Sequence, residues 1–410
     1  ELLGFARPEP KIASVRILKH QKKKLDQSIV LFFKGPESYT GEDVMELHLH
    51  GGRAVIEGVY SALSAQKGFR FAENGEFSKR AVINGRIDLT EAEGINDLIN
   101  AETEAQRDQG LNQLEGALRL QLEKWSNDLK GFGAHIEAYI DFPDEQIPEN
   151  VLSDLLQGVE ETNRELKEFV DDDRKGEILR SGLKVAVIGP PNVGKSSFVN
   201  WLTKRDIAIT SEKAGTTRDI VEAHLDLGGY PVTVADTAGM RESEDTIEQE
   251  GIRRARSWSE SADLRVLILD PETAEDANAF SDLLKSGDPV LMNKADRITI
   301  VKKKMSAAYS LVSVKTGYGL ESILSELTTI AKRKMGTQKP TTITQARHRA
   351  LLNDCLTALR EADFGLRNHA DLELIAEDFR SAIYCIGRIT GHIDVEDLLD
   401  VVFKEFCIGK

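Results

Sequence analysis

The chain has 410 residues, of which 40% are hydrophobic and 30% charged, a composition that is ordinary for a globular protein. At about 100–200 residues per domain, this length predicts two to four domains, each large enough to bury a core. The formal net charge of −15 argues against a surface coated for non-specific nucleic-acid binding, although it allows a local basic patch.

The sequence also disfavours a membrane-spanning protein and a fold that a structural zinc ion stabilises. No apolar run approaches the roughly 20 residues of a membrane span. The three cysteines, Cys355, Cys385 and Cys407, show no zinc spacing and are typical of free thiols in a reducing compartment. The chain starts at Glu1 and not at methionine, so we expect its natural beginning, with any targeting peptide, to be missing.

Residues 1–88 predict a domain of mixed strands and helices. "SIVLFF" (28–33) is a β-rich run that Lys34-Gly35-Pro36 ends. "VMELHLH" (44–50) alternates apolar and polar residues until Gly51-Gly52, and a helix is expected from about Val55 to Lys67. The pattern is typical of an α+β domain.

Residues 89–181 predict long helices. "DFPDE" (141–145) ends the first helix, and a second runs from Leu152 to Phe169. In the first helix, apolar residues recur at steps of three and four: Leu111, Leu114, Leu118, Leu122, Trp125, Leu129, Phe132 and Ile136.

Residues 182–334 alternate strands with helices, and residues 335–410 are helical again. Strand-like runs such as "LKVAVIG", "PVTVAD" and "LRVLILD" indicate the parallel sheet of a βαβ domain. After Pro340 an apolar stripe runs from Leu372 to Ile389, Gly391 ends it, and a last helix is expected over about 395–406. Because a helix cannot bury such a stripe alone, we expect 89–181 and 335–410 to form one discontinuous helical domain around an inserted 182–334. Two separate helical domains are the alternative.

A phosphate-binding loop opens the α/β segment. "GPPNVGKSS" (Gly189–Ser197) follows the expected strand directly and begins an expected helix. Backbone N–H groups of such a loop approach the phosphates, Lys195 reaches the β and γ oxygens, and Ser196 is a ligand of Mg²⁺. The residues predicted to contact nucleotide here are Asn192, Val193, Gly194, Lys195, Ser196 and Ser197.

Four further motifs follow in the order expected of a GTPase. "GTTRD" (215–219) supplies Thr217 as a second Mg²⁺ hydroxyl, and "DTAG" (236–239) places Asp236 to hold the metal through water. In "NKAD" (293–296), the Asp296 carboxylate can accept from both the N1–H and the 2-amino group of guanine, so we predict GTP. "SVKTG" (313–317) is the last base-contacting loop. Together these motifs predict nucleotide contacts from Gly215, Thr216, Thr217, Asp236, Thr237, Ala238, Gly239, Asn293, Lys294, Asp296, Ser313, Val314 and Lys315.

The group that orients the attacking water is not the usual glutamine. Small Ras-like GTPases carry glutamine directly after "DTAG", where this chain has Met240, which cannot do so. The following segment offers other candidates, most of which could equally be a solvated acidic loop. They are Arg241, Glu242, Glu244, Asp245 and Glu248.

Over essentially its whole length the sequence resembles the MnmE/TrmE family of tRNA-modification GTPases. The resemblance rests on "GPESYTGEDVMELHLHGG" (35–52), "NGEFSKRAVINGRIDLTEAE" (74–93), "DFPDE", the five GTPase motifs and the terminal "CIGK". It implies a multidomain α+β and α/β fold: an N-terminal folate-binding domain (1–88), a discontinuous helical bundle (89–181 and 335–410) and an inserted P-loop Ras-like G domain (182–334).

The resemblance also implies partners. The family forms homodimers through the N-terminal domains and binds a FAD-containing subunit of the MnmG/GidA type. The two proteins install an aminomethyl-type group on C5 of the wobble uridine of certain tRNAs, with a one-carbon unit from 5-formyl- or methylene-tetrahydrofolate. We expect a mitochondrial matrix protein, with the bacterial cytoplasm as the alternative.

Family roles transfer to matching residues of the G domain. In this family the G domains pair across K⁺, and an acid of switch II, here Glu248, arranges the attacking water. Lys195 and Arg241 join it as expected catalytic residues. The resemblance makes Asn192 a ligand of K⁺, together with a loop that contributes Ser211, Lys213 and Thr216. The family usually has threonine where Ser211 stands.

Folate roles transfer to the two ends of the chain. Glu46 matches the carboxylate that holds the pterin ring, and Arg86 stands where the family has lysine, so this contact keeps its charge but not its geometry. The resemblance places Cys407 and Lys410 of the tail close to the one-carbon group.

Two of these segments and the function itself also have alternative interpretations. Glu46, His48 and His50 share a strand face and could imitate a metal site, although a polar face is favoured. "KHQKKK" (19–24) could touch tRNA phosphates, although a solvated hairpin tip is favoured. Two other functions stay open: a regulatory GTPase switch on RNA or ribosomes, and a folate-dependent transferase that GTP controls.

Overall fold

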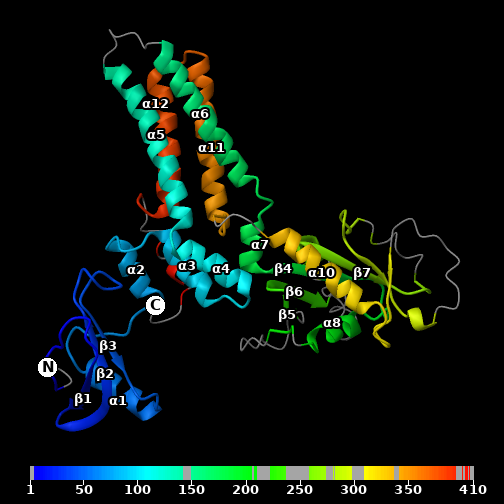
Figure 1. The fold of residues 1–410 in the computed structure, drawn as a ribbon, viewed down its shortest axis with the longest axis horizontal. Coiled ribbons are helices and arrows are strands. Elements are labelled where there is room, and N and C mark those ends of the chain that lie inside the picture. Colours follow the sequence, from blue (N-terminus) through cyan, green and yellow to red (C-terminus); the bar gives the residue numbers. More distant parts are fainter. Residues whose placement is uncertain are drawn as a thin grey trace, which may run out of the picture. The chain divides into compact units, whose positions relative to one another are not determined.

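A computed structural model describes residues 4–141, 149–205, 207–209, 222–236, 258–273, 280, 282–297, 309–336, 341–393, 399, 402–404 and 406 (Figure 1). The chain divides into two compact units. One consists of Glu1–Asn96, Gln113–Asn163 and Leu351–Lys410, and the other of Asp97–Asn112 and Arg164–Ala350. Each unit therefore combines segments that are distant in sequence, while the exact domain boundaries given above stay predictions.

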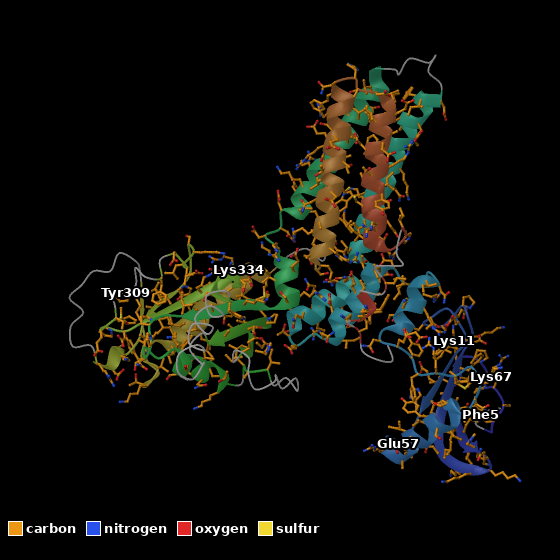
Figure 2. All side chains as sticks on the ribbon, turned by 180° about the vertical axis from the view of Figure 1, so that it is seen from behind. Phe5, Lys11, Glu57, Lys67, Tyr309 and Lys334 are labelled. Atoms are coloured by element: carbon orange, nitrogen blue, oxygen red, sulfur yellow. The ribbon has the colours of Figure 1, made fainter. Side chains whose placement is uncertain are left out.

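The N-terminal segment folds into a three-stranded antiparallel sheet with a helix on one face. Strands β1 (Ser14–His20), β2 (Lys23–Phe33) and β3 (Val44–His48) lie in the order β1-β2-β3, and helix α1 spans Arg53–Ser64. Leu18 and Val30 of the sheet pack with Val59 and Ala62 of α1. Phe5, which is labelled in Figure 2, lies against this cluster. Because side chains alternate along a strand, this leaves the other face of the sheet uncovered by α1.

Four long helices from both sides of the α/β segment form a bundle, which confirms the expected discontinuous helical arrangement. They are α5 (Ala117–Asp141), α6 (Glu149–Val170), α11 (Ala346–Arg367) and α12 (Leu372–Thr390) (Figure 1). The rings of Phe132 on α5 and Phe379 on α12 have centroids 6.0 Å apart. Arg367 of α11 pairs with Glu160 of α6 at 3.1 Å. Gly391 ends α12 with φ 81°, as the sequence predicted.

The prediction of one helix through Leu111 and Ile136 is wrong. The chain breaks between α4 (Glu104–Leu114) and α5. Gly116 has φ 80° and its N–H donates to the carbonyl of Gln113, so the chain turns at this glycine although the apolar spacing continues across it. Before the break, α2 (Glu76–Ile83) and α3 (Leu89–Ile99) follow the sheet.

The described residues of the α/β segment form a six-stranded sheet in the order β5-β6-β4-β7-β8-β9, in which the β5–β6 pair is antiparallel and the other four pairs are parallel. Its elements are α7 (Lys175–Ser181), β4 (Leu183–Ile188), α8 (Lys195–Thr203), β5 (Glu222–Leu227), β6 (Tyr230–Asp236), β7 (Leu264–Leu269), β8 (Val290–Met292), η2 (Ala295–Arg297), β9 (Ser310–Leu311) and α10 (Leu320–Met335).

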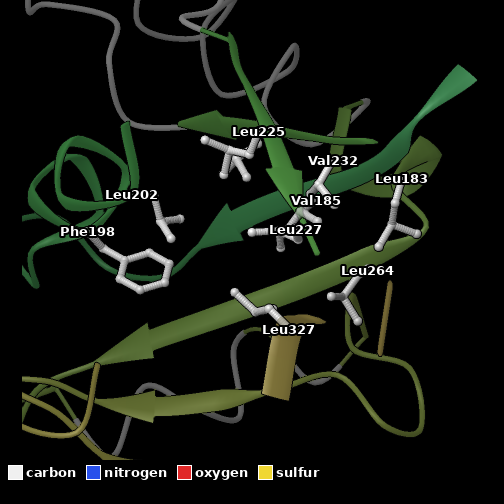
Figure 3. Close-up of a pocket in the computed structure, with 10 residues that line it drawn as sticks. Leu183, Val185, Phe198, Leu202, Leu225, Leu227, Val232, Leu264 and Leu327 are labelled. Atoms are coloured by element: carbon white, nitrogen blue, oxygen red, sulfur yellow. The ribbon is translucent and has the colours of Figure 1, made fainter. Parts of the chain in front are cut away.

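Both faces of this sheet are covered. Val185 and Val187 of β4 belong to one apolar cluster, and Ala186 and Ile188 belong to another. Figure 3 shows a pocket inside the first cluster, lined only by apolar side chains such as Phe198. It has no polar group to orient a ligand and belongs to the core.

Helix α4 braces the turn of the β5–β6 hairpin. The N–H of Ala105 donates to the carbonyl of Gly229 in that turn at 3.1 Å. The next residue, Gln106, donates from Nε2 to the carbonyl of Arg180 at the end of α7, also at 3.1 Å. The turn of the hairpin is thereby attached to α4, and α4 is attached to the end of α7.

The C-terminal segment packs against α3. Phe403 and Phe406 are buried in one cluster with Leu89 and Ala92. Gly75 lies against both phenylalanines: a Cβ there would be 2.8 Å from Cδ1 of Phe403 and 2.9 Å from Cβ of Phe406. The absence of a side chain at position 75 is thus what admits this segment.

Within the ranges that the structure describes, no helix is long and apolar enough to cross a membrane.

We predict that Gly75→Ala destabilises this contact by about 2–4 kcal/mol, from a left-handed φ of 64° and from overpacking. Gly85→Ala is the matched control, because Gly85 has φ 65° but no atom lies within 4 Å of the place that its Cβ would take, so only the backbone term applies. Hydrogen exchange of the α3 amides measures the difference. Equal acceleration in both variants would show that the phenylalanine contacts are unimportant.

Candidate functional site

The phosphate loop lies between β4 and α8, as the sequence predicted. Gly189 has φ 142°, and a Cβ there would be 2.1 Å from the carbonyl oxygen of Ile268, so only glycine fits. Asn192 is also left-handed, with φ 61°, and Gly194 precedes α8 with φ 104°. The N-terminus of α8 is therefore presented to the loop, which favours an anion there.

The lysine of this loop is held across it. Lys195 is the first residue of α8 and is buried, and its Nζ donates to the carbonyls of Gly189 at 2.8 Å and Pro190 at 2.6 Å. These bonds fix a cationic side chain over the loop. Ser196 and Ser197 are exposed, so the Ser196 hydroxyl is accessible to a metal ion.

One buried asparagine joins the phosphate loop to the base loops. Asn293, which directly follows β8, donates from Nδ2 to the carbonyl of Val193 at 2.7 Å. Its Oδ1 accepts from the N–H of Val314 at 3.0 Å. A Cβ at Gly194 would lie 2.4 Å from the same Nδ2, so this glycine is required by the asparagine. Three motifs that lie far apart in sequence thus converge.

The predicted guanine-reading carboxylate is exposed and oriented. Asp296 accepts from the Ser313 hydroxyl at 2.6 Å, and this bond is the main reason why the pKa of Asp296 lies below its ordinary value. Lys315 and Arg297 add to the effect. The group is therefore ionised at neutral pH, as pairing with two N–H donors of guanine requires.

Sequence reasoning missed Asp270, which holds Lys294. The buried carboxylate, at the end of β7, accepts from Nζ of Lys294 at 2.5 Å and from the N–H of Thr273. Burial alone would raise the pKa of Asp270, but the bonds from Lys294 and Thr273 outweigh it and lower the pKa. The signal was available, because "LRVLILD" ends in an acid at the carboxyl edge of a parallel sheet, where ligands bind.

Most of the predicted switch residues lie outside the described residues. These are Ser211, Lys213, Gly215, Thr216, Thr217, Thr237, Ala238, Gly239, Arg241 and Glu248, together with Cys407 and Lys410 of the tail. Asp236 is the last residue of β6, which places its backbone beside the phosphate loop strand, because Asp236 pairs with Val187. The roles assigned to the switch residues and to Cys407 and Lys410 stay predictions.

In the N-terminal segment, the two motifs that carry the resemblance meet. Asn84 donates from Nδ2 to the carbonyl of Thr40 at 2.7 Å, and the Tyr39 hydroxyl shares a hydrogen bond of 2.7 Å with Ser78. Arg86 also lies beside this loop, since a Cβ at Gly41 would be 3.2 Å from its Cγ. The loop after β2 is thus fixed on α2, a contact that sequence reasoning did not foresee.

Glu76 at the start of α2 stabilises this junction. It accepts from Arg70 at 2.7 Å and Arg80 at 2.6 Å, and Arg80 also contacts Glu42 at 2.9 Å. The bond from Arg70 is the largest of the effects that lower the pKa of Glu76 to about 2. The network therefore holds its charge throughout the neutral range.

Glu46 and Arg86, the two expected folate residues, are not joined directly in the described part of the chain. Glu46 on β3 lies 3.4 Å from Nε2 of His48. His50 instead contacts the buried Asp26 at 2.8 Å. No group of three or more His, Cys, Asp or Glu that could hold a metal occurs among the described residues. The metal reading of this strand therefore gains no support.

Two known protein families match the chain. The profile described as the MnmE helical domain matches residues 89–407, and the profile described as the GTP-binding protein TrmE N-terminus matches residues 3–86. Together the two profiles span nearly the full sequence, on both sides of the inserted segment.

Curated relatives match over almost their whole length. The chain is 47% identical over 386 residues to the tRNA modification GTPase MnmE of Parvibaculum lavamentivorans, covering 94% of this chain and 87% of the relative. It is 44% identical over 413 residues to the protein of that name from Paramagnetospirillum magneticum, covering 100% and 92%. Both relatives are bacterial, so the expectation of a mitochondrial matrix protein gains no support.

Among solved structures, the G domain of the T. maritima FeoB iron transporter is 23% identical, covers 36% of this chain and 98% of its own, and gives a TM-score of 0.29. A variant of Aquifex aeolicus Era bound to GDP·AlF₄⁻ is 22% identical, covers 43% and 66%, and also gives 0.29. At scores this low, the likeness adds nothing to what the sheet of this chain shows by itself.

We predict that Asp296→Asn lowers GTP affinity by about 100-fold and shifts preference towards XTP, since an amide can donate to the 2-oxo group of xanthine. Fluorescent-nucleotide titration measures both affinities. Ser313→Ala is the control: it removes the orienting bond but keeps the carboxylate, so guanine preference should survive. Unchanged base selectivity in Asp296→Asn would contradict the assignment.

Proposed function

This chain belongs to the MnmE family of tRNA modification GTPases, and we propose that it hydrolyses GTP as one subunit of a complex that modifies C5 of the wobble uridine in certain tRNAs. The bridge that Asn293 forms between the phosphate loop and the base loops is the observation that carries the nucleotide part of this proposal. The bacterial relatives favour the bacterial cytoplasm as its location.

GTP and Mg²⁺ fit the described residues. The loop amides and Lys195 would hold the β and γ phosphates, and Asp296 would hold the base. Ser196 would coordinate Mg²⁺, joined by Thr217 and by Asp236 through water. The ion would offset charge on the phosphate oxygens, and Lys195, whose Nζ lies at the loop carbonyls of Gly189 and Pro190, would do the same from within the loop.

Hydrolysis requires a substitute for the missing glutamine. We assign Glu248 the role of arranging the attacking water, with Arg241 beside it, because Met240 offers no hydrogen bond. A monovalent cation bound by Asn192 and the loop that contains Ser211, Lys213 and Thr216 would supply positive charge between paired G domains. The left-handed backbone and exposed side chain of Asn192 support its availability for this.

An uncovered sheet face supports the homodimer. Val15, Ile17 and Ile29 are 59%, 42% and 44% exposed on the face of the N-terminal sheet opposite α1. Val15 and Ile29 are direct partners across β1 and β2, so they form one apolar patch. A second copy of the N-terminal segment is the occupant that we propose, because such patches on soluble chains mark association surfaces.

The buried C-terminal segment supports a folate site that includes the tail. Phe406 is buried in one cluster with Leu89, which follows Arg86 closely in sequence, and Cys407 is the next residue after Phe406 in sequence. We propose that Glu46 and Arg86 bind a tetrahydrofolate and that Cys407 and Lys410 lie near its one-carbon unit. A FAD-containing subunit and tRNA complete the complex.

We predict that K⁺ accelerates GTP hydrolysis about 100-fold over Na⁺, because a fixed cation offsets the charge that develops on the phosphates. Phosphate release at equal ionic strength measures this. Glu248→Ala is the control for chemistry: it should keep GTP affinity and lose about 10²–10⁴-fold in rate in either salt. Equal rates of the unsubstituted chain in K⁺ and Na⁺ would refute the cation mechanism.

We further predict that a strain without this protein loses the C5 substituent of wobble uridine. Mass spectrometry of tRNA nucleosides measures the loss, and re-expression of the unsubstituted chain should restore the modification while Glu248→Ala should not. Unchanged nucleosides would favour the alternative of an RNA- or ribosome-associated GTPase switch.

A further inference from the structure

We propose that the tip of the β1–β2 hairpin, residues 19–24, is a contact surface for the phosphate backbone of tRNA. This inference rests on the proposed function, since it names where that substrate touches the chain. The segment "KHQKKK" contains four lysines and a histidine. As a sequence it is compatible with a solvated turn, but its register and backbone are unfavourable for that role.

The pairing of the hairpin sets like charges opposite one another. Lys19 is the direct partner of Lys24, and in the next pair Lys23, opposite His20, adds a further ammonium group beside them. Like charges in such positions destabilise an antiparallel pair. A hairpin selected only for stability and solubility would alternate the sign of its charges here.

No carboxylate relieves this repulsion within the part of the chain that the structure describes. None of the four lysines forms an ion pair there, and Lys24 contacts only the neutral amide of Gln27, at 3.4 Å. The next acid along the strand, Asp26, is buried and bonded to His50 at 2.8 Å. The positive charge therefore stays available to an external anion.

The turn itself departs from the residues that its backbone favours. Gln21 and Lys22 have φ 48° and 67°, so both are left-handed. Two-residue turns of this kind prefer Asn-Gly, because other side chains strain the backbone. The register also shifts between Leu18 and Lys19. Departures from local rules that cluster at one place indicate a function that offsets them.

The chemistry of the tip suits a nucleic-acid backbone better than a lipid surface. Lysine ammonium groups are compact point charges that bind phosphates without demanding one geometry. Residues 19–24 carry no apolar side chain to insert into a bilayer, which stable membrane binding requires. With 53 basic against 68 acidic residues, the chain as a whole repels a polyanion, so a concentrated cationic tip would restrict where tRNA can dock.

The test is the double variant Lys19→Gln/Lys24→Gln in the full chain, which removes one like-charged pair and keeps an unbranched polar side chain at both positions. Binding of unmodified, in vitro transcribed tRNA is measured over a series of potassium concentrations. We expect about tenfold weaker binding and a salt slope that is shallower by about 1–2. Thermal unfolding should shift upward, because the repulsion is gone. A segment that only supports the fold would not give weaker binding together with higher stability.

Two matched variants complete the experiment. Lys19→Arg/Lys24→Arg keeps the charge and should keep tRNA affinity. Lys130→Gln/Lys285→Gln removes the same charge from exposed positions elsewhere and should leave affinity unchanged. Equal weakening by the latter pair, or an unchanged affinity and salt slope in Lys19→Gln/Lys24→Gln, would overturn the inference, as would a defect confined to binding vesicles of anionic lipid.

The GTPase rate without tRNA separates this inference from the proposed function. Lys19→Gln/Lys24→Gln should hydrolyse GTP as fast as the unsubstituted chain, because the hairpin is no part of the nucleotide site. If the unsubstituted chain hydrolyses no GTP, the proposed function fails. If hydrolysis is intact and the hairpin variants bind tRNA normally, only the inference fails.

Discussion

The amide of Asn293 is the interaction on which the nucleotide site depends. The amide donates one hydrogen bond to the phosphate loop and accepts one from the last base loop. Aspartate has no such donor and leucine has neither group, so neither residue could replace it. Because the group is buried, leaving either bond unmade would cost about 1–3 kcal/mol. The requirement for glycine at position 194 follows from the position of this amide, which occupies the space of a side chain.

A similar principle organises the N-terminal segment. Loop 34–43 lies between β2 and β3. Asn84 donates a hydrogen bond to the backbone of this loop, and the hydroxyl of Tyr39 in the loop is hydrogen-bonded to Ser78. The loop and the α2 region look like unrelated motifs in sequence, but they are packed together as one structural unit. The surface on which Arg86 lies is therefore built from both stretches.

Sequence predicted the α/β segment better than the helical parts. The strand before the phosphate loop and the helix at Lys195 were correct, because strand-like apolar runs and glycines constrain the backbone locally. The break at Gly116 was missed, since an apolar stripe can continue through a turn. Asp270 was missed because its role depends on Lys294, and contacts between distant residues leave no local pattern. The like-charged register of β1 and β2 could not be read from sequence for the same reason.

The attachment of Gly229 to α4 connects the two central segments of the predicted nucleotide switch to the helices beside the sheet. Strand β5 follows the predicted first switch segment in sequence, and the predicted second switch segment follows β6, so one hairpin joins the two segments. Its far end is tied to Ala105, whose neighbour Gln106 is tied to α7. Because the turn of this hairpin is hydrogen-bonded to α4, and α4 to the end of α7, any displacement of the hairpin has to change or carry along these contacts.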